Sequence, residues 1–188
     1  MAFETVAEPL PGLRVLDPGG FRDGRGAFTK LFHLPSLGAA LGGAALREVF
    51  VTESAQGVVR GMHFQSPPHD HLKLVACTRG RVLDVVLDLR RGSPAYGRAM
   101  GIELDGAAPR LVWIPPGFAH GFAARTDGAQ MLYMTTAEHA PDHDHGIAWD
   151  SFGFDWPEGA GRGPGLLSER DGRHPALASF ESPFSWDG

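Results

Sequence analysis

The sequence predicts an all-β protein folded as a sandwich or a barrel. Two features indicate this class. Short runs of β-branched and other apolar residues recur along the chain, and glycine (26) and proline (15) are scattered between them as turn residues. Only one early stretch, residues 34–45, has helical character, with Pro35 near its start, and its glycines make it a poor helix.

The expected strands, in chain order, cover residues 13–16, 27–32, 46–52, 58–65, 72–78, 82–89, 99–104, 111–114, 120–124 and 130–136. After Trp156-Pro157 the composition changes to PEGAGRGPG, which is typical of a loop. We therefore expect the segment 157–188 to be peripheral or to return and cap a site. Because no repeat or linker divides the chain, we expect a single domain over residues 1–188.

Composition narrows the class of protein. The 188 residues are enough for one domain with a sizeable core, and the net charge of −5 argues against a nucleic-acid partner. Cys77 is the single cysteine, so no disulfide can form within the chain, which fits a reducing compartment. The N-terminal sequence lacks the features of a signal peptide, and no apolar run is long enough to span a membrane. We therefore expect a cytoplasmic protein with no membrane contact.

The run GVVRGMHFQ, residues 57–65, is the first candidate for a functional site. On a strand, His63 and Gln65 share one face and Arg60 lies on the other. A bulge or kink at Gly61 would let Arg60 and His63 converge on one cavity. Pro67-Pro68 then forces a turn, and a hairpin would bring Lys73 back beside His63. Two cations beside a histidine suit an anionic ligand or a developing anion.

A second motif, IPPGFAHGF at residues 114–122, has the P-x-G-x-x-H spacing of the second cupin motif, with His120 as its histidine. The first cupin motif requires a second histidine two residues after His63, where this chain has Gln65. The pattern therefore favours a barrel without a metal. The HDH triplets at 69–71 and 143–145 lie in turns rich in proline and aspartate, where solvated loop residues are the favoured interpretation.

Two further polar side chains lie within apolar strands. Asp84 is central in VLDVVLDL, so it either faces solvent or is buried with a partner. Tyr133, in QMLYMTT, either fills the barrel with its hydroxyl at the rim or points inward as a proton donor.

The strings GVVRGMHFQSPP, KLVACTRGRVLDVVLDLRRGSPAYG, LVWIPPGFAHGF, GIAWD, FDWP and LLSERD occur in this order. Together they resemble the dTDP-4-dehydrorhamnose 3,5-epimerase (RmlC-type) family, from about Leu13 to Asp171. The resemblance implies a cupin-like jelly-roll β-barrel with a few short peripheral helices. It also implies a homodimer, no metal or other cofactor, and a nucleotide-linked 4-keto sugar as substrate.

The chemistry of such a substrate explains the residue types. A 4-keto group acidifies C3 and C5, so epimerisation needs a base, an acid on the opposite face and a group that holds the enolate oxygen. The resemblance assigns His63 as the base, since histidine titrates near working pH. Asp171 would hold its tautomer. Tyr133 would be the acid, and Lys73 would stabilise the enolate.

The resemblance also implies a set of binding residues. Arg25 matches an arginine that reaches the pyrophosphate, and Phe28 matches a neighbour of the base. Asp84 matches a buried partner of His120 or Lys73. The N-terminal segment would be exchanged between the two subunits of the dimer. The expected substrate-binding residues are Arg25, Phe28, Lys30, Arg60, Gln65, His120 and His139.

The chain departs from the family pattern at three places. Lys30 replaces a glutamate that accepts a hydrogen bond from the thymine ring, and lysine can only donate. The segment 48–54 lacks the family's Q-x-N, and His139 replaces a tyrosine. The proton-transfer residues are intact, so these changes bear on the nucleotide or the sugar.

Several alternatives remain open. One is an epimerase of C3 or C5 alone, or one that uses a nucleotide other than thymidine. Another is a related jelly-roll ketoisomerase, against which Tyr133 and Asp171 together argue. A metal-dependent cupin and a non-catalytic sugar-nucleotide binding module are less favoured.

Overall fold

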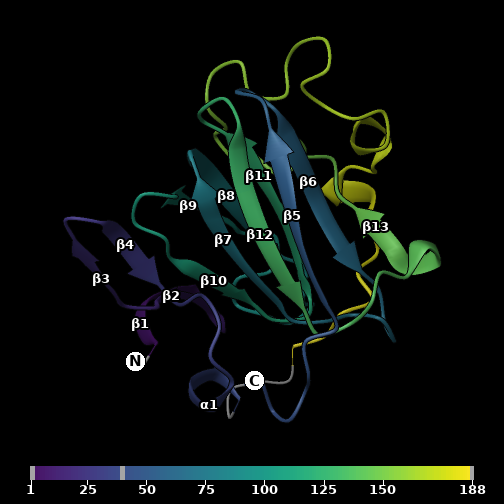
Figure 1. Ribbon diagram of the computed structural model, residues 1–188. Coiled ribbons are helices and arrows are strands. Elements are labelled where there is room, and N and C mark those ends of the chain that lie inside the picture. Colours follow the sequence, from purple (N-terminus) through teal and green to yellow (C-terminus); the bar gives the residue numbers. More distant parts are fainter. Residues whose placement is uncertain (1–2, 39–40, 187–188) are drawn as a thin grey trace.

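Two antiparallel β-sheets face each other in the computed structural model, which describes residues 3–38 and 41–186 (Figure 1). The ends of the predicted domain lie outside this range. The first sheet has the order β1 (Glu4–Leu10), β2 (Leu13–Asp17), β10 (Leu111–Ile114), β7 (Lys73–Arg79), β12 (Ala129–Thr135) and β5 (Glu48–Ser54). The second has the order β13 (Asp144–Gly146), β6 (Val59–Gln65), β11 (Phe118–Ala124), β8 (Arg81–Asp88) and β9 (Ala99–Asp105).

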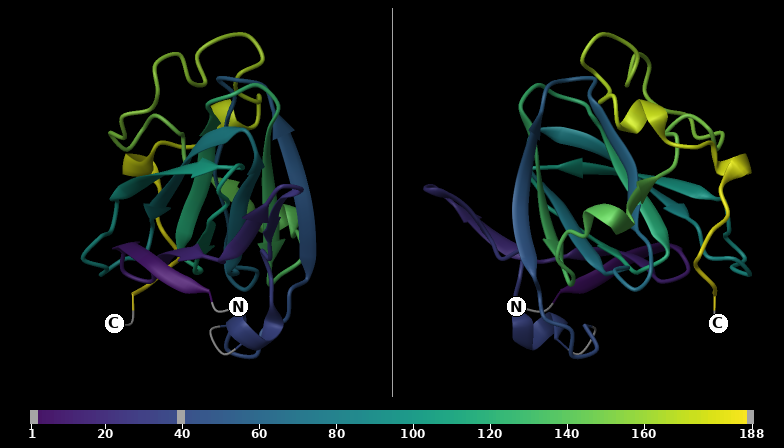
Figure 2. Two further views of the ribbon diagram at one scale, coloured as in Figure 1. Left: turned by 60° about the vertical axis from the view of Figure 1, so that its left-hand side comes forward. Right: turned by 90° about the vertical axis from the view of Figure 1, so that its right-hand side faces the viewer.

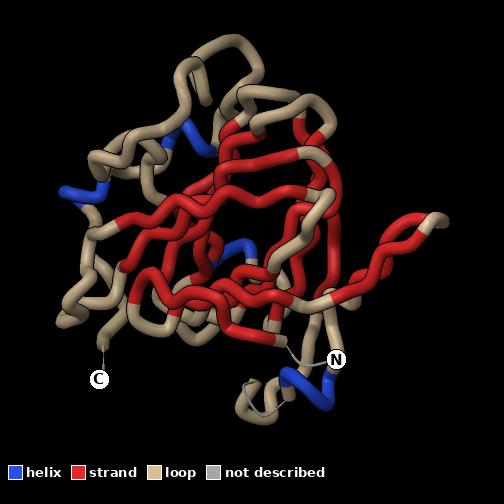
Figure 3. Tube along the Cα trace, turned by 90° about the vertical axis from the view of Figure 1, so that its left-hand side faces the viewer, coloured by secondary structure: helices blue, strands red, loops and turns tan. Residues whose placement is uncertain are grey.

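A third, two-stranded element stands away from this body. Strands β3 (Gly20–Asp23) and β4 (Gly26–Thr29) form a hairpin, which we call the arm (Figures 2 and 3). Its phenylalanines, Phe21 and Phe28, are 56% and 42% exposed and stack on each other with ring centroids 5.3 Å apart. Apolar side chains exposed on an isolated hairpin are unusual for a monomer.

Helical structure is sparse, as predicted, and the fold is a cupin-like jelly roll. The α-helix α1 covers only Leu34–Leu37, and 3₁₀ turns η1, η2 and η3 cover Pro141–His143, Asp171–Arg173 and Leu177–Ser179. The helix predicted over residues 34–45 is therefore too long: residues 39 and 40 lie outside the described range, and Gly42 and Gly43 adopt positive φ angles of 60° and 86°. No helix in the described part of the chain is long and apolar enough to cross a bilayer.

The sequence missed three strands for identifiable reasons. β1 contains Pro9, which is tolerated because the strand lies at a sheet edge. β3 and β13 are four and three residues long and carry mostly polar side chains. Such strands form because a neighbour pairs with them, a fact that local composition does not encode.

The core is divided by the alternation of side chains on each strand. Val86 and Phe122 from one sheet and Val75 and Met131 from the other belong to the cluster between the sheets. Val85 and Leu87 point the other way and are covered by the chain after β13, including Ile147 and Phe184. This second cluster fixes the C-terminal segment against the outer face of the five-stranded sheet.

A glycine contact between β6 and β11 shapes the cavity wall. His120 pairs with His63 but Phe122 pairs with Arg60, so β6 has one extra residue there. Gly61 has φ of 129°, and a Cβ on it would lie 2.5 Å from the Cα of Gly121. The predicted bulge at Gly61 is confirmed, and it turns both Arg60 and His63 toward one cavity.

Candidate active site

A cavity of about 350 Å³ opens between the two sheets. Its walls carry the predicted site residues Arg60, His63, Gln65, Lys73, His120, Tyr133 and His139. They come from strands β6 and β11 on one side and from β7 and β12 on the other, with His139 on the connection to β13. The jelly roll thus gathers residues that lie far apart in the sequence.

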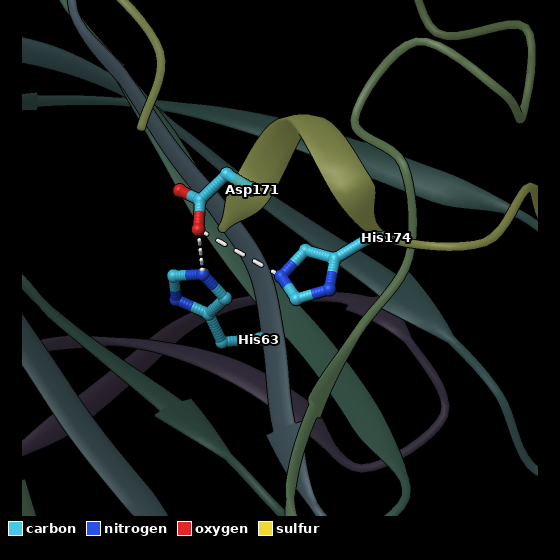
Figure 4. A group of neighbouring side chains, drawn as sticks. All are labelled: His63, Asp171 and His174. Carbon is cyan, nitrogen blue, oxygen red and sulfur yellow. Dashed lines mark hydrogen bonds and ion pairs between the residues drawn. The ribbon is translucent and has the colours of Figure 1, made fainter. Parts of the chain in front are cut away.

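A buried aspartate orients the histidine on β6. His63 Nε2 lies 2.8 Å from Asp171 Oδ1, which comes from η2 (Figure 4). Asp171 Oδ2 also accepts a hydrogen bond from the Gly61 N–H at 3.2 Å. Since Nε2 donates to the carboxylate, the neutral imidazole has its lone pair on Nδ1. The structure therefore brings together the two residues of the predicted dyad, with one histidine nitrogen left to act as a base.

Burial and charge set the protonation state of this pair. Burial lowers the pKa of the His63 imidazole, and this outweighs the opposite effect of Asp171. Burial also acts to raise the pKa of the Asp171 carboxyl, but the imidazoles of His174 and His63 more than offset it and hold that pKa well below its usual range. A neutral imidazole beside a carboxylate is the form that can accept a proton near neutral pH.

Lys73 lies beside the dyad, though not by the predicted hairpin. Its Nζ donates to the backbone oxygen of His63 at 3.2 Å. Strands β6 and β7 belong to different sheets, because the turn at Pro67-Pro68 carries the chain across the jelly roll. Burial lowers the pKa of the Lys73 ammonium to about 8, and Asp144 limits this shift. Lys73 therefore still carries its charge at neutral pH.

Tyr133 occupies the wall opposite His63. It belongs to β12 in the six-stranded sheet, is 9% exposed and stacks on Phe50 with ring centroids 4.8 Å apart. Burial raises the pKa of its phenol, and the charge of Asp84 adds to this effect. The hydroxyl thus keeps its proton, as a proton donor must.

A second histidine–aspartate pair lies deeper in the cavity. His120 Nε2 is 2.7 Å from Asp84 Oδ1, and Asp84 is fully buried. The prediction that Asp84 is buried with a partner is confirmed, and the partner is His120. The His120 ring contacts Tyr133 edge-on, with centroids 5.9 Å apart. This pair gives the cavity floor a fixed polar surface.

The side chains of the remaining predicted cavity residues form hydrogen bonds with neighbouring groups of the protein. Gln65 donates to the His69 backbone oxygen at 2.9 Å and accepts from the Ala140 N–H at 2.8 Å. Arg60 Nε donates to Ser54 Oγ at 2.9 Å, which holds it against β5. His139 Nε2 lies 3.0 Å from Asp144 Oδ2. Gln65 thus braces the loop at the cavity mouth, whereas Arg60 and His139 face the cavity from its rim.

The interpretation of the HDH triplets as solvated loop residues holds only in part: residues 69–71 lie in a loop, whereas Asp144 and His145 belong to β13. Asp144 lines the cavity, and its side chain is 14% exposed and bound by Arg170 at 2.8 Å. His71 also lines the cavity. The pairing of Asp144 with Gln65 in β13 carries the second triplet to the cavity mouth, and sequence spacing alone gives no sign of it. Phe50 on β5 also lines the cavity, and its position in the sequence likewise gave no sign of this.

The arm residues lie elsewhere within the single chain. The Arg25 side chain is 86% exposed and pairs with Asp23 at 2.7 Å. Phe28 stacks on Phe21 in the arm, and Lys30 follows directly after β4. The structure does not bring Arg25, Phe28 or Lys30 to the cavity of their own chain.

Among the described residues, one group has donor atoms close enough to suggest a metal. The ligand atoms of His63, Asp171 and His174 lie within 4.8 Å of one another. His63 Nε2 already donates a hydrogen bond to Asp171 Oδ1, however, so this nitrogen has no lone pair free for a metal. Gln65, at the position of a cupin metal ligand, uses its side-chain amide in hydrogen bonds to the neighbouring loops. These contacts fit a proton-transfer site better than a metal centre.

A jelly roll with a histidine–aspartate dyad on one wall of its cavity and a protonated tyrosine on the other defines an acid–base enzyme. The family model of dTDP-4-dehydrorhamnose 3,5-epimerase matches residues 7–179, and the chain belongs to this family of carbohydrate isomerases. A dTDP-4-dehydrorhamnose 3,5-epimerase of Sinorhizobium fredii is 36% identical over 99% of this chain and 94% of the relative. One of Pseudomonas aeruginosa is 38% identical over 92% and 94%.

Solved structures of related epimerases superpose closely on this chain. A 3,5-epimerase from Legionella pneumophila, in complex with dTDP-4-keto-L-rhamnose, superposes with a TM-score of 0.90 at 29% identity, covering 99% of this chain and 100% of that one. NovW, a 4-keto-6-deoxy sugar epimerase from Streptomyces spheroides, superposes with a TM-score of 0.86 at 35% identity, covering 95% and 89%.

Replacing the buried ammonium should stabilise the protein. The lowered pKa of Lys73, about 8 against 10.5, means that its charge opposes folding below pH 8 and that this cost fades as the pH rises toward 10.5. After allowance for partial solvent contact, we expect Lys73→Met to raise the free energy of unfolding by about 2 kcal/mol at pH 7 and by much less at pH 10.

Urea unfolding at both pH values measures this difference. Lys73→Arg is the matched control, because a guanidinium stays charged at both pH values and its cost should not fade. An equal gain for Lys73→Met at pH 7 and pH 10 would show that the ammonium is not desolvated.

Proposed function

We propose that this protein epimerises C3, C5 or both in a nucleotide-linked 4-keto-6-deoxy sugar, by removing and returning protons next to the ketone. The observation that carries this proposal is the opposition of His63, held by Asp171, to the protonated Tyr133 on the facing sheet. A base and an acid on opposite walls can act on opposite faces of one carbon. The family relationship and the sugar nucleotides named for related enzymes support the same substrate class.

The proposed reaction uses the geometry in three steps. The ketone makes the neighbouring C–H acidic, and His63 Nδ1 takes this proton while Asp171 stabilises the imidazolium that forms. The negative charge moves to the ketone oxygen, where the Lys73 ammonium stabilises the enolate. Tyr133 then donates its proton to the opposite face of the same carbon, which inverts the centre.

The thymidine-linked sugar is our first candidate substrate, because the related enzymes act on dTDP sugars. Lys30, which replaces the expected glutamate, is the main argument for another base, since it could donate to an acceptor such as cytosine N3. Tighter binding of a thymidine-linked sugar than of its cytidine and uridine counterparts would argue against that alternative. We place the enzyme in the cytoplasm, consistent with its single buried cysteine.

Solvent exchange tests the proposed roles directly. With a dTDP-linked 4-keto-6-deoxyglucose in D₂O, we expect NMR to show deuterium entering next to the ketone as the product forms. His63→Ala should abolish this exchange with the fold intact. Tyr133→Phe should slow epimerisation by about 100-fold or more and still allow deuterium to enter from the His63 side.

The same spectra separate the alternatives. Deuterium at both carbons would exclude an enzyme of a single centre, and a product with its ketone moved would identify a ketoisomerase. Near-normal turnover by His63→Ala would refute the assignment of the base.

We further propose that the protein is a homodimer in which each arm completes the partner's site. The arm presents Arg25, Phe21 and Phe28 to solvent, and none of them lines the cavity that holds His63 in their own chain. Strand β5 forms a sheet edge at the cavity and exposes Val49 and Val51, which are 61% and 55% accessible. Such an apolar edge is expected to be covered by another chain.

Complementation tests the exchange of arms. Arg25→Ala damages the arm and His63→Ala damages the cavity, so each variant alone should be weakly active or inactive. In a mixed dimer, one site combines an intact arm with an intact cavity. Co-expressed variants should therefore regain about a quarter of wild-type activity, since about half of the dimers are mixed and each has one good site. Recovery no greater than the sum of the separate variants would contradict the exchange.

A further inference from the structure

His174 lies against the proposed dyad and has no role in the mechanism above. It follows η2, and its Nε2 is 3.7 Å from Asp171 Oδ1, the oxygen that also binds His63 (Figure 4). The rings of His174 and His63 meet edge-on, with centroids 5.6 Å apart and planes at 76°. Two imidazoles therefore face a single carboxylate oxygen: His63 lies within hydrogen-bond distance of it and His174 just beyond that distance.

The polar atom that faces Asp171 is buried. The His174 side chain is 10% exposed, and none of the described residues forms a hydrogen bond with its Nε2. A buried imidazole nitrogen without a partner is costly unless it faces a compatible charge. A proton on Nε2 would point at the Asp171 carboxylate, whereas a lone pair there would face an anion. The position therefore favours the tautomer with its proton on Nε2.

A glycine provides the space for this ring. Gly146 on β13 pairs directly with His63 on β6. A Cβ on Gly146 would collide with the His174 imidazole, and the nearest atoms it would meet all belong to that ring. Gly146 is not among the glycines with positive φ, so its backbone does not require glycine. The missing side chain opposite His63 thus forms the slot that His174 fills.

The ring also separates the dyad from a second cavity. This outer cavity, of about 510 Å³, is lined by Gly146, His174, Arg170, Arg173 and Phe180. If the ring were removed, water from that side would reach Asp171. His174 therefore lies where a side chain can control both the orientation and the hydration of the aspartate.

We propose that His174 is a positioning residue of the dyad, which presents Nε2–H to Asp171 and shields it from the outer cavity, so that His63 stays oriented and unprotonated. Its effect on turnover rests on the proposed function of His63, whereas its effect on the dyad itself does not.

Both the donated N–H and the exclusion of water are expected to lower the pKa of the His63 imidazole. An N–H dipole aimed at Asp171 weakens the negative potential that favours the His63 imidazolium, and exclusion of water disfavours the charged ring. The groups whose charges act on His63 are Asp171, Lys73, Arg170 and Asp144, and the neighbouring His174 ring meets it edge-on. Of these, His174 is the one whose removal alters both the hydrogen-bond environment and the hydration of the carboxylate.

Three variants distinguish a hydrogen-bond donor at position 174 from a ring that only occupies the space. His174→Phe keeps the ring volume and removes the donor, whereas His174→Gln keeps an N–H donor. NMR titration of the His63 Cε1–H without substrate should show its pKa raised by about half a unit in His174→Phe and nearly unchanged in His174→Gln. Gly146→Ala, which displaces the ring from another strand, should raise it similarly. The acid limb of kcat/KM should move with the titration in each variant.

The wild-type protein provides a check that needs no substitution. Nitrogen-15 NMR should show the neutral His174 ring protonated at Nε2. An Nδ1–H tautomer would overturn the proposal, as would an unchanged His63 titration in both His174→Phe and Gly146→Ala, or equal shifts in His174→Phe and His174→Gln. Because these titrations use no substrate, they can fail while the epimerase activity stands, and the activity can fail while they succeed.

Discussion

The site depends on one hydrogen bond, from His63 Nε2 to Asp171 Oδ1 at 2.8 Å. It joins strand β6 of the five-stranded sheet to a 3₁₀ turn that follows 108 residues later in the chain. The C-terminal segment must therefore pack on the outer face of the five-stranded sheet before His63 is oriented. Ile147 and Phe184 supply that packing from within the cluster around Met62, so the apolar exterior of this sheet helps to hold the proposed dyad together.

Electrostatics in the cavity follow from burial between the two sheets. Burial makes His63 less basic, keeps the Tyr133 phenol protonated and lowers the pKa of Lys73 to about 8. Burial thus favours the neutral base and the protonated acid that the proposed chemistry needs near neutral pH, whereas Lys73 keeps the charge needed for the enolate because its lowered pKa still lies above 7. Removal of water thus sets the protonation states of His63 and Tyr133, while Asp144 limits the shift at Lys73 and Asp171 stays ionised because the imidazoles of His174 and His63 lie beside it.

The sequence predicted the fold class and the residues of the dyad, because strand runs are local and the strings around His63, His120 and Asp171 resemble a known family. It also predicted the bulge at Gly61, since glycine marks such positions. It could not predict contacts made by pairing over long distances. Asp144 looked like a loop residue until β13 paired with β6, and Lys73 reached His63 from the opposite sheet, not through a hairpin. Arg25 and Phe28 stay apart from the cavity in a single chain, which sequence spacing could not reveal.

The most direct test of the dyad is the rate of deuterium exchange from the His63 side in Asp171→Asn. This change preserves the shape of the side chain and removes the charge that stabilises the imidazolium. We expect the exchange rate to fall by about 10²- to 10⁴-fold, with binding of the sugar nucleotide nearly unchanged. An exchange rate within a few-fold of the wild type would contradict the account, because His63 would then not need Asp171 to act as a base.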